Sequence, residues 1–542
     1  MTLEHETGWK LLRSLRTLSI PLLLLTATAC GGGAPEEVDY DLLITGARVL
    51  DGTGAPGYEA DLAIVGERIE RVSKRGIRRL DDRPVIDATG LVLAPGFIDL
   101  HAHLNPLLRL PDAESHVRQG VTTALGGPDG TAPWPLGEHL DSAATLGVGL
   151  NVAFLTGHNT IRRRVMGNAD RAPTPDELAE MQRMVAQAMG EGAFGISTGL
   201  KYLPGAFSEI DEVIALSQVA SDSGGIYTSH LREEGLELLE GVAEAIEIGR
   251  RASIPIVLTH HKVVGRPMWG SSKTTLAMVD SARAEGIDVV MDQYPYTATH
   301  TGITILIPSW ARADGNRAFL RRVEDPALRD SIIDGIIFNI ENDRGGGDLR
   351  RVQFSRVPWD RSLEGKTLYD WAISQGKEAT PEVGAELVIE AVRRGGASAV
   401  FHALDEDDVR RIMRHEQTMI ASDGRLTRPG EGHPHPRSYG TFPRVLGHYV
   451  RDEGVLTLEE AVKKMTFLPA ERLGLEDRGR IAEGAYADLV LFDPETVADQ
   501  ATFEDPHQYP AGIEYVFVNG VGTVIEGEFH DLRPGKVLRR GR

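Results

Sequence analysis

The sequence predicts an α/β protein built on a (β/α)8 TIM barrel, with a β-sandwich domain formed by both chain ends and a small inserted domain. Three observations support this prediction. Strand-like runs alternate with amphipathic helices through the middle of the chain, the two ends carry alternating strand segments, and one interval between runs is too long for a single helix. A composition of 41% hydrophobic and 25% charged residues is typical of a globular protein.

The first thirty residues have the pattern of an export signal. Basic residues precede an apolar run over 18–25, which is too short to span a bilayer comfortably, and small residues follow it. Two interpretations of the signal peptide 1–29 stay open. Ordinary cleavage gives a secreted protein, whereas a bacterial lipoprotein signal leaves a lipid on Cys30 and anchors the chain in the cell envelope. We favour the lipoprotein, because Cys30 is the only cysteine and the Gly-rich start of 30–40 predicts a flexible tether.

Charge and cysteine content exclude several kinds of partner. The 58 basic and 79 acidic residues give a net charge of −21, which argues against nucleic acid because phosphate binding needs clustered positive charge. The same charge disfavours direct binding to anionic lipid, so a membrane is expected as a partner only through Cys30. A single cysteine allows no intramolecular disulfide and leaves the folded body without a thiolate metal ligand.

Short strands and turns fill the two ends of the chain. Residues 41–92 and 470–542 are therefore predicted to be the halves of one β-sandwich beside the barrel. The segment 52–57 spells GxGxxG, but strand-like residues rather than a helix follow it. A hairpin turn explains this segment better than a dinucleotide site.

Eight strand-like runs between these ends predict the barrel strands. They are 93–103, 121–127, 149–156, 193–198, 225–230, 255–260, 287–294 and 418–423. Amphipathic helices lie between them, most clearly over 233–252. The barrel is assigned to 93–308 and 397–469, and the long interval before the last run is assigned to an inserted small domain over 309–396.

Histidine and aspartate side chains stand at the ends of four predicted strands. The first run ends in His101 and His103, which point the same way because side chains alternate along a strand. The fifth ends in His230, the sixth in His260 and the eighth in Asp423. The carboxyl ends of the strands form the active-site face of such a barrel, so these side chains are expected to converge as a metal-ligand set.

The motifs around these residues resemble the amidohydrolase superfamily, and within it the N-acyl-D-amino-acid deacylases (D-aminoacylases). They are PGFIDLHAH (95–103), GAFGISTGLKYLPG (192–205), YTSHLRE (227–233), THHK (259–262), DQYPYTA (292–298), IASDG (420–424) and HPHPRSYGTFPRVLGHY (433–449). The resemblance covers nearly the whole mature chain. It implies metal-dependent hydrolysis of the amide bond of N-acyl-D-amino acids, with one or two zinc ions per chain.

The resemblance also implies a role for each metal ligand. His230 and His260 would bind a tight ion, and the histidine pair of strand one together with Asp423 would surround a second, weaker one. The family has a shared cysteine after strand two, where this chain has Asp129. We expect the Asp129 carboxylate to bridge the two ions instead. Asp423 would take the proton of the attacking water and return it to the leaving nitrogen.

The substrate's carboxylate is assigned by the same resemblance to Arg437, Lys262, Tyr202 and one of Tyr294 or Tyr296. Lys262 follows His260 by two residues and so shares its strand face, which supports this assignment independently. His158, which follows the third run, is a candidate for contacting the substrate or orienting a ligand.

Other functions are less well supported. The segment 195–199 fits GxSxG, but no helix follows it as a nucleophile elbow requires. Cyclic-amide hydrolases of the superfamily use a carbamylated lysine at the end of strand four, where this chain has Ser197 and Thr198. A dipeptidase of the same superfamily stays open. A non-catalytic, lipid-anchored binding protein would be expected to lose metal ligands that this chain retains.

Overall fold

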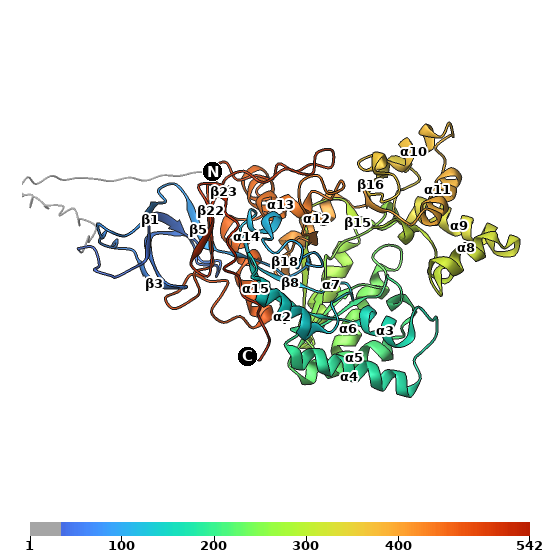
Figure 1. Cartoon of the computed structure of the whole chain (residues 1–542), viewed down its shortest axis with the longest axis horizontal. Helices are drawn as coiled ribbons and strands as arrows, with labels where there is room; N and C mark the ends of the chain where they lie inside the picture. The colour runs from blue at the N-terminus through green and yellow to red at the C-terminus, as the bar shows by residue number, and fades with distance from the viewer. Residues whose placement is uncertain (1–33, 542) are drawn as a thin grey trace, which may run out of the picture.

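The computed structural model describes residues 34–541 (Figure 1). The predicted signal peptide, 1–29, and Cys30 lie outside the described residues. Within them, no helix combines the length and the apolar character needed to cross a membrane.

A closed barrel of parallel strands forms the centre of the molecule and confirms the predicted fold class. Its strands pair in the order β6 (Phe97–Asp99), β8 (Val121–Gly126), β9 (Asn151–Phe154) with its continuation β10 (Thr156–Gly157), β11 (Gly195–Gly199), β12 (Ile226–His230), β13 (Ile256–Leu258), β14 (Val289–Gln293) and β18 (Thr418–Ile420). The ring closes where β19 (Gly424–Arg425) pairs in parallel with β7 (Ala102–His103). The ends of the last and first strands therefore lie side by side.

The first predicted run, 93–103, is divided between two sheets. Its opening residues form β5 (Val92–Pro95), which pairs antiparallel with β20 (Leu489–Phe492) of the terminal domain. Only the part after Gly96 enters the barrel. A Cβ atom at Gly96 would lie 2.2 Å from the Thr122 side chain, so only glycine fits at this crossing.

Amphipathic helices cover the outside of the barrel, as the alternation in the sequence predicts. They are α1 (Glu114–Val117), α2 (Leu136–Leu146), α3 (His158–Met166), α4 (Pro175–Glu191), α5 (Ile210–Asp222), α6 (Leu238–Ala252), α7 (Ser272–Ala284), α12 (Glu406–Arg414), α13 (Arg437–Arg444), α14 (Leu458–Met465) and α15 (Phe467–Leu473). Capping boxes start α4 at Thr174 and α14 at Thr457. The apolar faces pack on the strands and leave the strand ends free to carry polar side chains.

The two chain ends form one domain with a nine-stranded sheet, seen beside the barrel in Figure 1. Its strands are β1 (Leu42–Val49), β2 (Tyr58–Val65), β3 (Arg68–Ser73), β4 (Val85–Asp87), β5, β20, β21 (Ile513–Val518), β22 (Val521–Ile525) and β23 (Glu528–Phe529). The sheet folds back on itself, because Ile69 N of β3 donates to Ala485 O just before β20 (2.9 Å). Its halves thus enclose a shared core that includes Leu62, Leu93 and Leu491.

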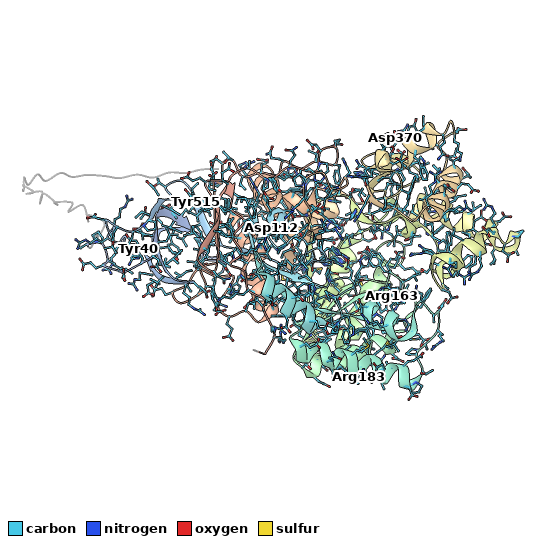
Figure 2. All side chains as sticks on the ribbon, viewed as in Figure 1. Tyr40, Asp112, Arg163, Arg183, Asp370 and Tyr515 are labelled. Carbon is cyan, nitrogen blue, oxygen red and sulfur yellow. The ribbon has the colours of Figure 1, made fainter. Side chains whose placement is uncertain are left out.

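The described part of the predicted tether, 34–40, is packed rather than free. Glu36 forms ion pairs with Arg71 (2.6 Å) and Arg75 (2.8 Å), and Tyr40 is buried in the terminal domain (Figure 2). At the other end, Val152 N of β9 donates to Lys536 O (2.9 Å), so the last residues lie along the barrel. Ion pairs and backbone pairing thus hold both ends of the described part of the chain to the folded body.

The insertion is longer than the predicted 309–396. Its small antiparallel sheet has the order β15 (Thr299–Gly302), β17 (Ser398–Phe401) and β16 (Val352–Arg356), with helices α8 (Asn316–Glu324), α9 (Pro326–Asn342), α10 (Leu368–Ser374) and α11 (Pro381–Arg393). Thr299 pairs with Phe401, so the two strands that enter and leave the insertion close its neck. Figure 1 shows the helices of the insertion projecting away from the terminal domain.

Candidate metal centre and active-site cleft

A cleft of roughly 960 Å³ lies at the carboxyl ends of the barrel strands, between the barrel and the insertion. The barrel contributes His103, His230, His260 and Asp423 to its lining, and the insertion contributes residues such as Arg344. The insertion therefore forms one wall of the site that the strand ends build.

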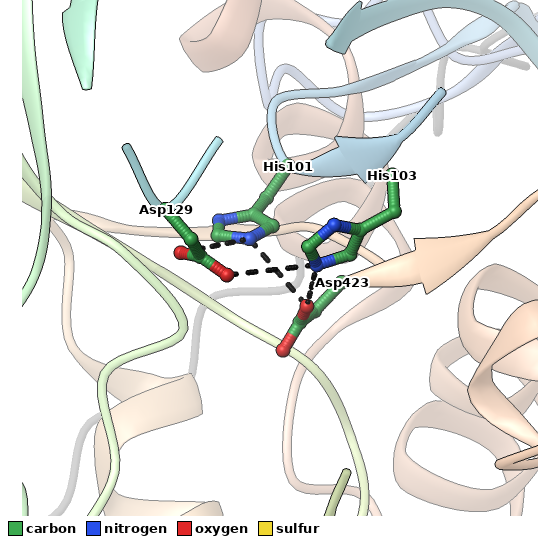
Figure 3. Close-up of side chains that lie close together, drawn as sticks. All are labelled: His101, His103, Asp129 and Asp423. Atoms are coloured by element: carbon green, nitrogen blue, oxygen red, sulfur yellow. Dashed lines mark hydrogen bonds and ion pairs between the residues drawn. The ribbon is translucent and has the colours of Figure 1, made fainter. Parts of the chain in front are cut away.

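The predicted metal ligands gather in two groups that share one carboxylate. The groups are His101, His103, Asp129 and Asp423 (Figure 3), and Asp129, His230 and His260. Within each group the possible ligand atoms lie within 4.8 Å of one another. Side chains from strands one, two, five, six and eight of the barrel thus meet at one place.

Asp129 lies between the two groups. Its Oδ1 atom is 3.3 Å from His260 Nε2 and 3.7 Å from His230 Nδ1. Its Oδ2 atom is 3.6 Å from His103 Nε2. Because its two oxygens face different histidines, the carboxylate has the position that a ligand bridging two ions needs.

The donor set fits divalent metal ions. Two ligands on a tetrahedral zinc ion with bonds of about 2.0–2.1 Å lie about 3.3 Å apart, close to most of these separations. His101 Nε2 and Asp129 Oδ1, which face each other across the first group, are buried and lack a hydrogen-bond partner among the described residues. Buried polar atoms are normally satisfied, so these orphan atoms point to a shared ligand.

Three of the ligands stand on unusual backbone. Asp129 (φ 53°), His260 (φ 39°) and Asp423 (φ 48°) all adopt the left-handed region that side chains rarely occupy. Hydrogen bonds hold these turns: His260 N donates to Asp292 Oδ1 (2.6 Å) and Asp423 N donates to His101 O (2.8 Å). Strain of this kind persists where surrounding contacts enforce it, and it clusters at functional sites.

Both carboxylates in the ligand groups are held in the ionised form. Burial raises the pKa of Asp423, but the nearby Arg437 and His101 outweigh burial and hold this pKa below its ordinary value. Burial likewise opposes ionisation of Asp129, whose pKa His101 and His260 nevertheless hold well below the usual range. The anionic form is the one that binds a cation.

Glu234 supports both histidines of the second group and was missed by the sequence analysis. Its Oε1 atom lies 3.2 Å from His260 Nδ1, and its Oε2 atom lies 3.4 Å from His230 Nε2. Carboxylates that hold the outer nitrogen of a metal-binding imidazole orient the ring and raise its basicity. The position of Glu234, four residues after His230, was an available signal. Arg344, 3.5 Å from Glu234 Oε2, comes from the insertion and carried no such signal.

The residues assigned to the substrate's carboxylate form a cluster around Tyr294. The guanidinium of Arg437 is 4.7 Å and the ammonium of Lys262 is 5.7 Å from the centre of the Tyr294 ring, and all three residues line the cleft. The buried Tyr294 hydroxyl has no hydrogen-bond partner among the described residues. Tyr202 also lines the cleft, with its ring centre 4.4 Å from that of His230.

Two candidates from the sequence analysis face elsewhere. The Tyr296 hydroxyl points to Asp499 (3.5 Å) and its ring packs under Arg444, so Tyr294 is the tyrosine that faces the cleft. His158 is fully buried, with Nε2 2.7 Å from Glu212 Oε1, and Arg162 pairs with the same carboxylate. It belongs to an internal ion-pair cluster instead of the substrate or ligand shell, because α3 begins at His158 and turns the ring toward α5.

Comparison with known proteins agrees with this geometry. The model of the amidohydrolase family matches residues 84–524. A D-aminoacylase from Alcaligenes xylosoxydans xylosoxydans is 38% identical over 529 residues, which cover 93% of this chain and 99% of that protein.

Two solved structures cover 93% of this chain and 100% of their own, each with a TM-score of 0.78. One is a D-aminoacylase with a binuclear metal centre, 36% identical. The other is the N-acyl-D-glutamate deacylase of Bordetella bronchiseptica, 34% identical and complexed with zinc and a phosphonate inhibitor. This chain therefore belongs to the amidohydrolase family, among the N-acyl-D-amino-acid deacylases.

Proposed function

We propose that this protein hydrolyses the amide bond of N-acyl-D-amino acids and releases a carboxylate and a free D-amino acid. The observation that carries the proposal is the position of Asp129 between two groups of metal ligands, beside a cluster of cations suited to a carboxylate. The choice of D over L stereochemistry rests on the names of the relatives.

The metal is proposed to be zinc, with His230, His260 and Asp129 holding one ion and His101, His103, Asp129 and Asp423 holding the other. Nitrogen and oxygen donors in this number suit zinc. When bound, such an ion lowers the pKa of a water molecule toward about 7 and polarises the amide carbonyl. Glu234 and Arg437 would keep the surrounding ligands in position.

Asp423 would move the proton of the reaction. It is ionised, buried and reachable from the cleft, so it can accept a proton from the attacking water. The same carboxyl group then returns the proton to the amide nitrogen as the C–N bond breaks. Arg437 NH1, 2.8 Å from Asp423 Oδ2, keeps this carboxylate anionic between turnovers.

Lys262, Arg437 and the Tyr294 hydroxyl would hold the α-carboxylate of the substrate, with Tyr202 as a further hydrogen-bond donor. The buried Tyr294 hydroxyl has no hydrogen-bond partner among the described residues, so it can donate a hydrogen bond to a ligand. Charge-assisted bonds to a carboxylate would fix the substrate's orientation relative to the metal ligands.

The serine-hydrolase alternative loses support from the surroundings of Ser197. Its hydroxyl is buried, donates to Gly127 O (2.6 Å) and accepts from Gly130 N (3.0 Å). These bonds brace the loop that carries Asp129. Ser197 therefore has a positioning role there and is not exposed as a nucleophile.

A hydrolysis screen tests the proposal. Purified protein with added zinc is offered N-acetyl and N-succinyl derivatives of D- and L-amino acids, together with dipeptides, and bound metal is counted. We expect hydrolysis of D-derivatives and one or two zinc ions per chain. Less than about half an equivalent of metal, with no hydrolysis of any N-acyl amino acid, would favour a non-catalytic binding protein.

Export to the cell envelope is also proposed, from the signal pattern of residues 1–29 and the lone Cys30. The test compares the full chain with its Cys30→Ser variant in a bacterial host supplied with labelled palmitate. A lipoprotein incorporates the label and sediments with membranes, whereas the variant does neither. A wild-type protein found unlabelled in the soluble fraction would indicate ordinary secretion.

A further inference from the structure

Seven arginines line the cleft, and two of them lack side-chain partners among residues 34–541. Five are engaged: Arg109 with Glu431, Arg163 with Leu203 O, Arg344 with Glu234, Arg361 with Glu364 and Arg437 with Asp423. Arg356 and Arg425 are exposed into the cleft and have no such contact. In a chain with a net charge of −21, two free guanidinium groups in the substrate cleft need an explanation.

These two arginines come from different parts of the fold. Arg425 lies in β19 of the barrel and pairs in register with His103 of β7, beside the metal ligands. Arg356 ends β16 of the insertion. Both side chains line the same cleft, so the barrel and the insertion each place one of these cations in it.

The nearby carboxylate does not neutralise this pair. Glu431 lines the same cleft, yet both its oxygens are bound by Arg109 at 2.5 and 3.0 Å. Like charges held together without a counter-ion are unfavourable, and an anion between them removes the repulsion. Guanidinium groups are well suited to carboxylates, which they can bind through two parallel hydrogen bonds.

The position along the site indicates which part of a substrate would reach these arginines. Lys262, in the proposed carboxylate anchor, contacts His260 of one ligand group (2.6 Å). Arg425 is next to His103 of the other group. The scissile carbonyl must lie over the metal ligands, and the anchor around Tyr294 would hold the amino-acid side of the amide, although its Arg437 also contacts Asp423 of the His103 group. We therefore assign a group beyond His103 to the acyl side, and the second substrate pair below tests this assignment.

We propose that Arg356 and Arg425 form a subsite for a carboxylate carried by the acyl group. The preferred substrates would then be N-acyl-D-amino acids whose acyl group comes from a dicarboxylic acid, such as succinyl or glutaryl derivatives. This inference rests on the function proposed above. The cleft volume of roughly 960 Å³ leaves room for such an extended acyl chain, since pockets that bind drug-sized ligands typically measure about 300–1,000 Å³.

The test compares acyl groups of one length that differ in charge. N-succinyl derivatives of an accepted D-amino acid are measured against the uncharged succinamoyl analogues, for the wild type, Arg425→Met and Arg356→Met. The matched control is Arg163→Met, which removes a cleft arginine of α3 that is hydrogen-bonded to Leu203 O (Figure 2). N-acetyl-D-glutamate and N-acetyl-D-glutamine form a second pair, in which the extra carboxylate is on the amino-acid side chain.

The wild type should hydrolyse the succinyl substrate with a kcat/KM about tenfold above that of its uncharged analogue, and each variant should lose about this factor. Hydrolysis of the uncharged analogue should change less than about twofold, which also reports correct folding. Added salt should reduce the succinyl preference, because the subsite is open to solvent. Arg163→Met should keep the preference.

Three results would overturn the proposal. The succinyl substrate could be no better than its uncharged analogue, the Arg163 variant could lose the preference equally, or Arg425 and Arg356 could affect only the glutamate and glutamine pair. The last result would place the side chain of the amino acid at the subsite. In each case hydrolysis of uncharged N-acyl-D-amino acids would still support the proposed function. Absence of all hydrolysis would contradict both the proposed function and the subsite.

Discussion

Glu234 Oε1 lies 3.2 Å from His260 Nδ1, the ring nitrogen opposite the one that faces Asp129. The other oxygen of the same carboxylate lies 3.4 Å from His230 Nε2. One buried glutamate therefore orients both imidazoles that would bind one ion. Lys262 (2.5 Å) and Arg344 (3.5 Å) hold Glu234 in turn, which connects the barrel ligands to the insertion.

Replacement of Glu234 by glutamine should weaken zinc binding by about 10- to 100-fold, because the imidazoles lose their orienting charge. Competition with a chromogenic chelator measures the affinity. Glu233→Gln is the matched control, since Glu233 immediately precedes Glu234 and pairs with Lys201 instead of the histidines. Equal affinities for the two variants would mean that Glu234 does not support the ligands.

Asp129→Asn should reduce the number of bound metal ions from two to one per chain. An amide oxygen is neutral and a poor bridge, whereas a carboxylate can bind two ions at once. Elemental analysis after equilibration with excess zinc gives the count. Asp112→Asn, at a carboxylate that pairs with Arg428 (2.6 Å) outside the ligand groups, should retain both ions.

Asp423→Asn should lower kcat by about a thousandfold, the range expected on loss of a general acid and base. The asparagine has almost the same volume, so the thermal unfolding midpoint should change little. Steady-state kinetics and scanning calorimetry make the two measurements. If appreciable turnover remains, another group moves the proton.

Arg437→Met should raise KM by about 10- to 100-fold for substrates with a free α-carboxylate, because a charge-assisted hydrogen bond is lost. Substrates whose α-carboxylate is amidated should show no such increase. Arg437 also lies 2.8 Å from Asp423, so kcat is compared separately. A KM change of the same size for both substrate types would contradict the assignment.

Lys464 should make stability depend on pH in the alkaline range. Burial lowers its pKa from 10.5 to about 8, although its ammonium donates to His415 O (2.5 Å) and Thr418 O (2.9 Å). Below pH 8 both folded and unfolded chains carry the proton. Between pH 8 and pH 10.5 the unfolded chain keeps the Lys464 proton, whereas the folded chain has released it. The free energy of unfolding therefore rises with pH across this range.

The unfolding midpoint of the wild type should therefore rise relative to that of Lys464→Met from about pH 8 to pH 10. The corresponding gain in the free energy of unfolding is at most about 3 kcal/mol. Calorimetry across this range measures it. Lys463→Met, one position earlier in α14, supplies the baseline for removal of a charge from this helix. A difference that stays constant with pH would refute the assignment to Lys464.

Much of the barrel and of its ligand set was readable from the sequence, because both depend on local patterns. Alternating strand and helix periods define the eight βα units, and the carboxyl ends of parallel strands meet at one face whatever the loops between them do. His230 and His260 could therefore be placed together although their relative positions depend on a whole barrel. The predicted nearness of Asp129 to both histidine groups followed instead from the family resemblance, because Asp129 stands where the family has a shared cysteine.

Other features depend on contacts between distant segments and could not be read from the sequence. Thr299 pairs with Phe401 across the neck of the insertion, so the insertion begins and ends beyond the predicted bounds. Tyr294 and Tyr296 are both buried, yet only the packing of Asp499 and Arg444 shows that the second faces away from the cleft.

By itself, then, the sequence determined the barrel, the strand ends that carry metal ligands and the family, since periodicity and short motifs are local properties of the chain. The tertiary structure decided which side chains share an environment: Glu234 serves two histidines, and His158 pairs with Glu212. It also leaves Arg356 and Arg425 without a side-chain partner among residues 34–541. The physical reason is that hydrogen bonds and charge interactions act over a few ångströms, and only the folded chain sets those distances.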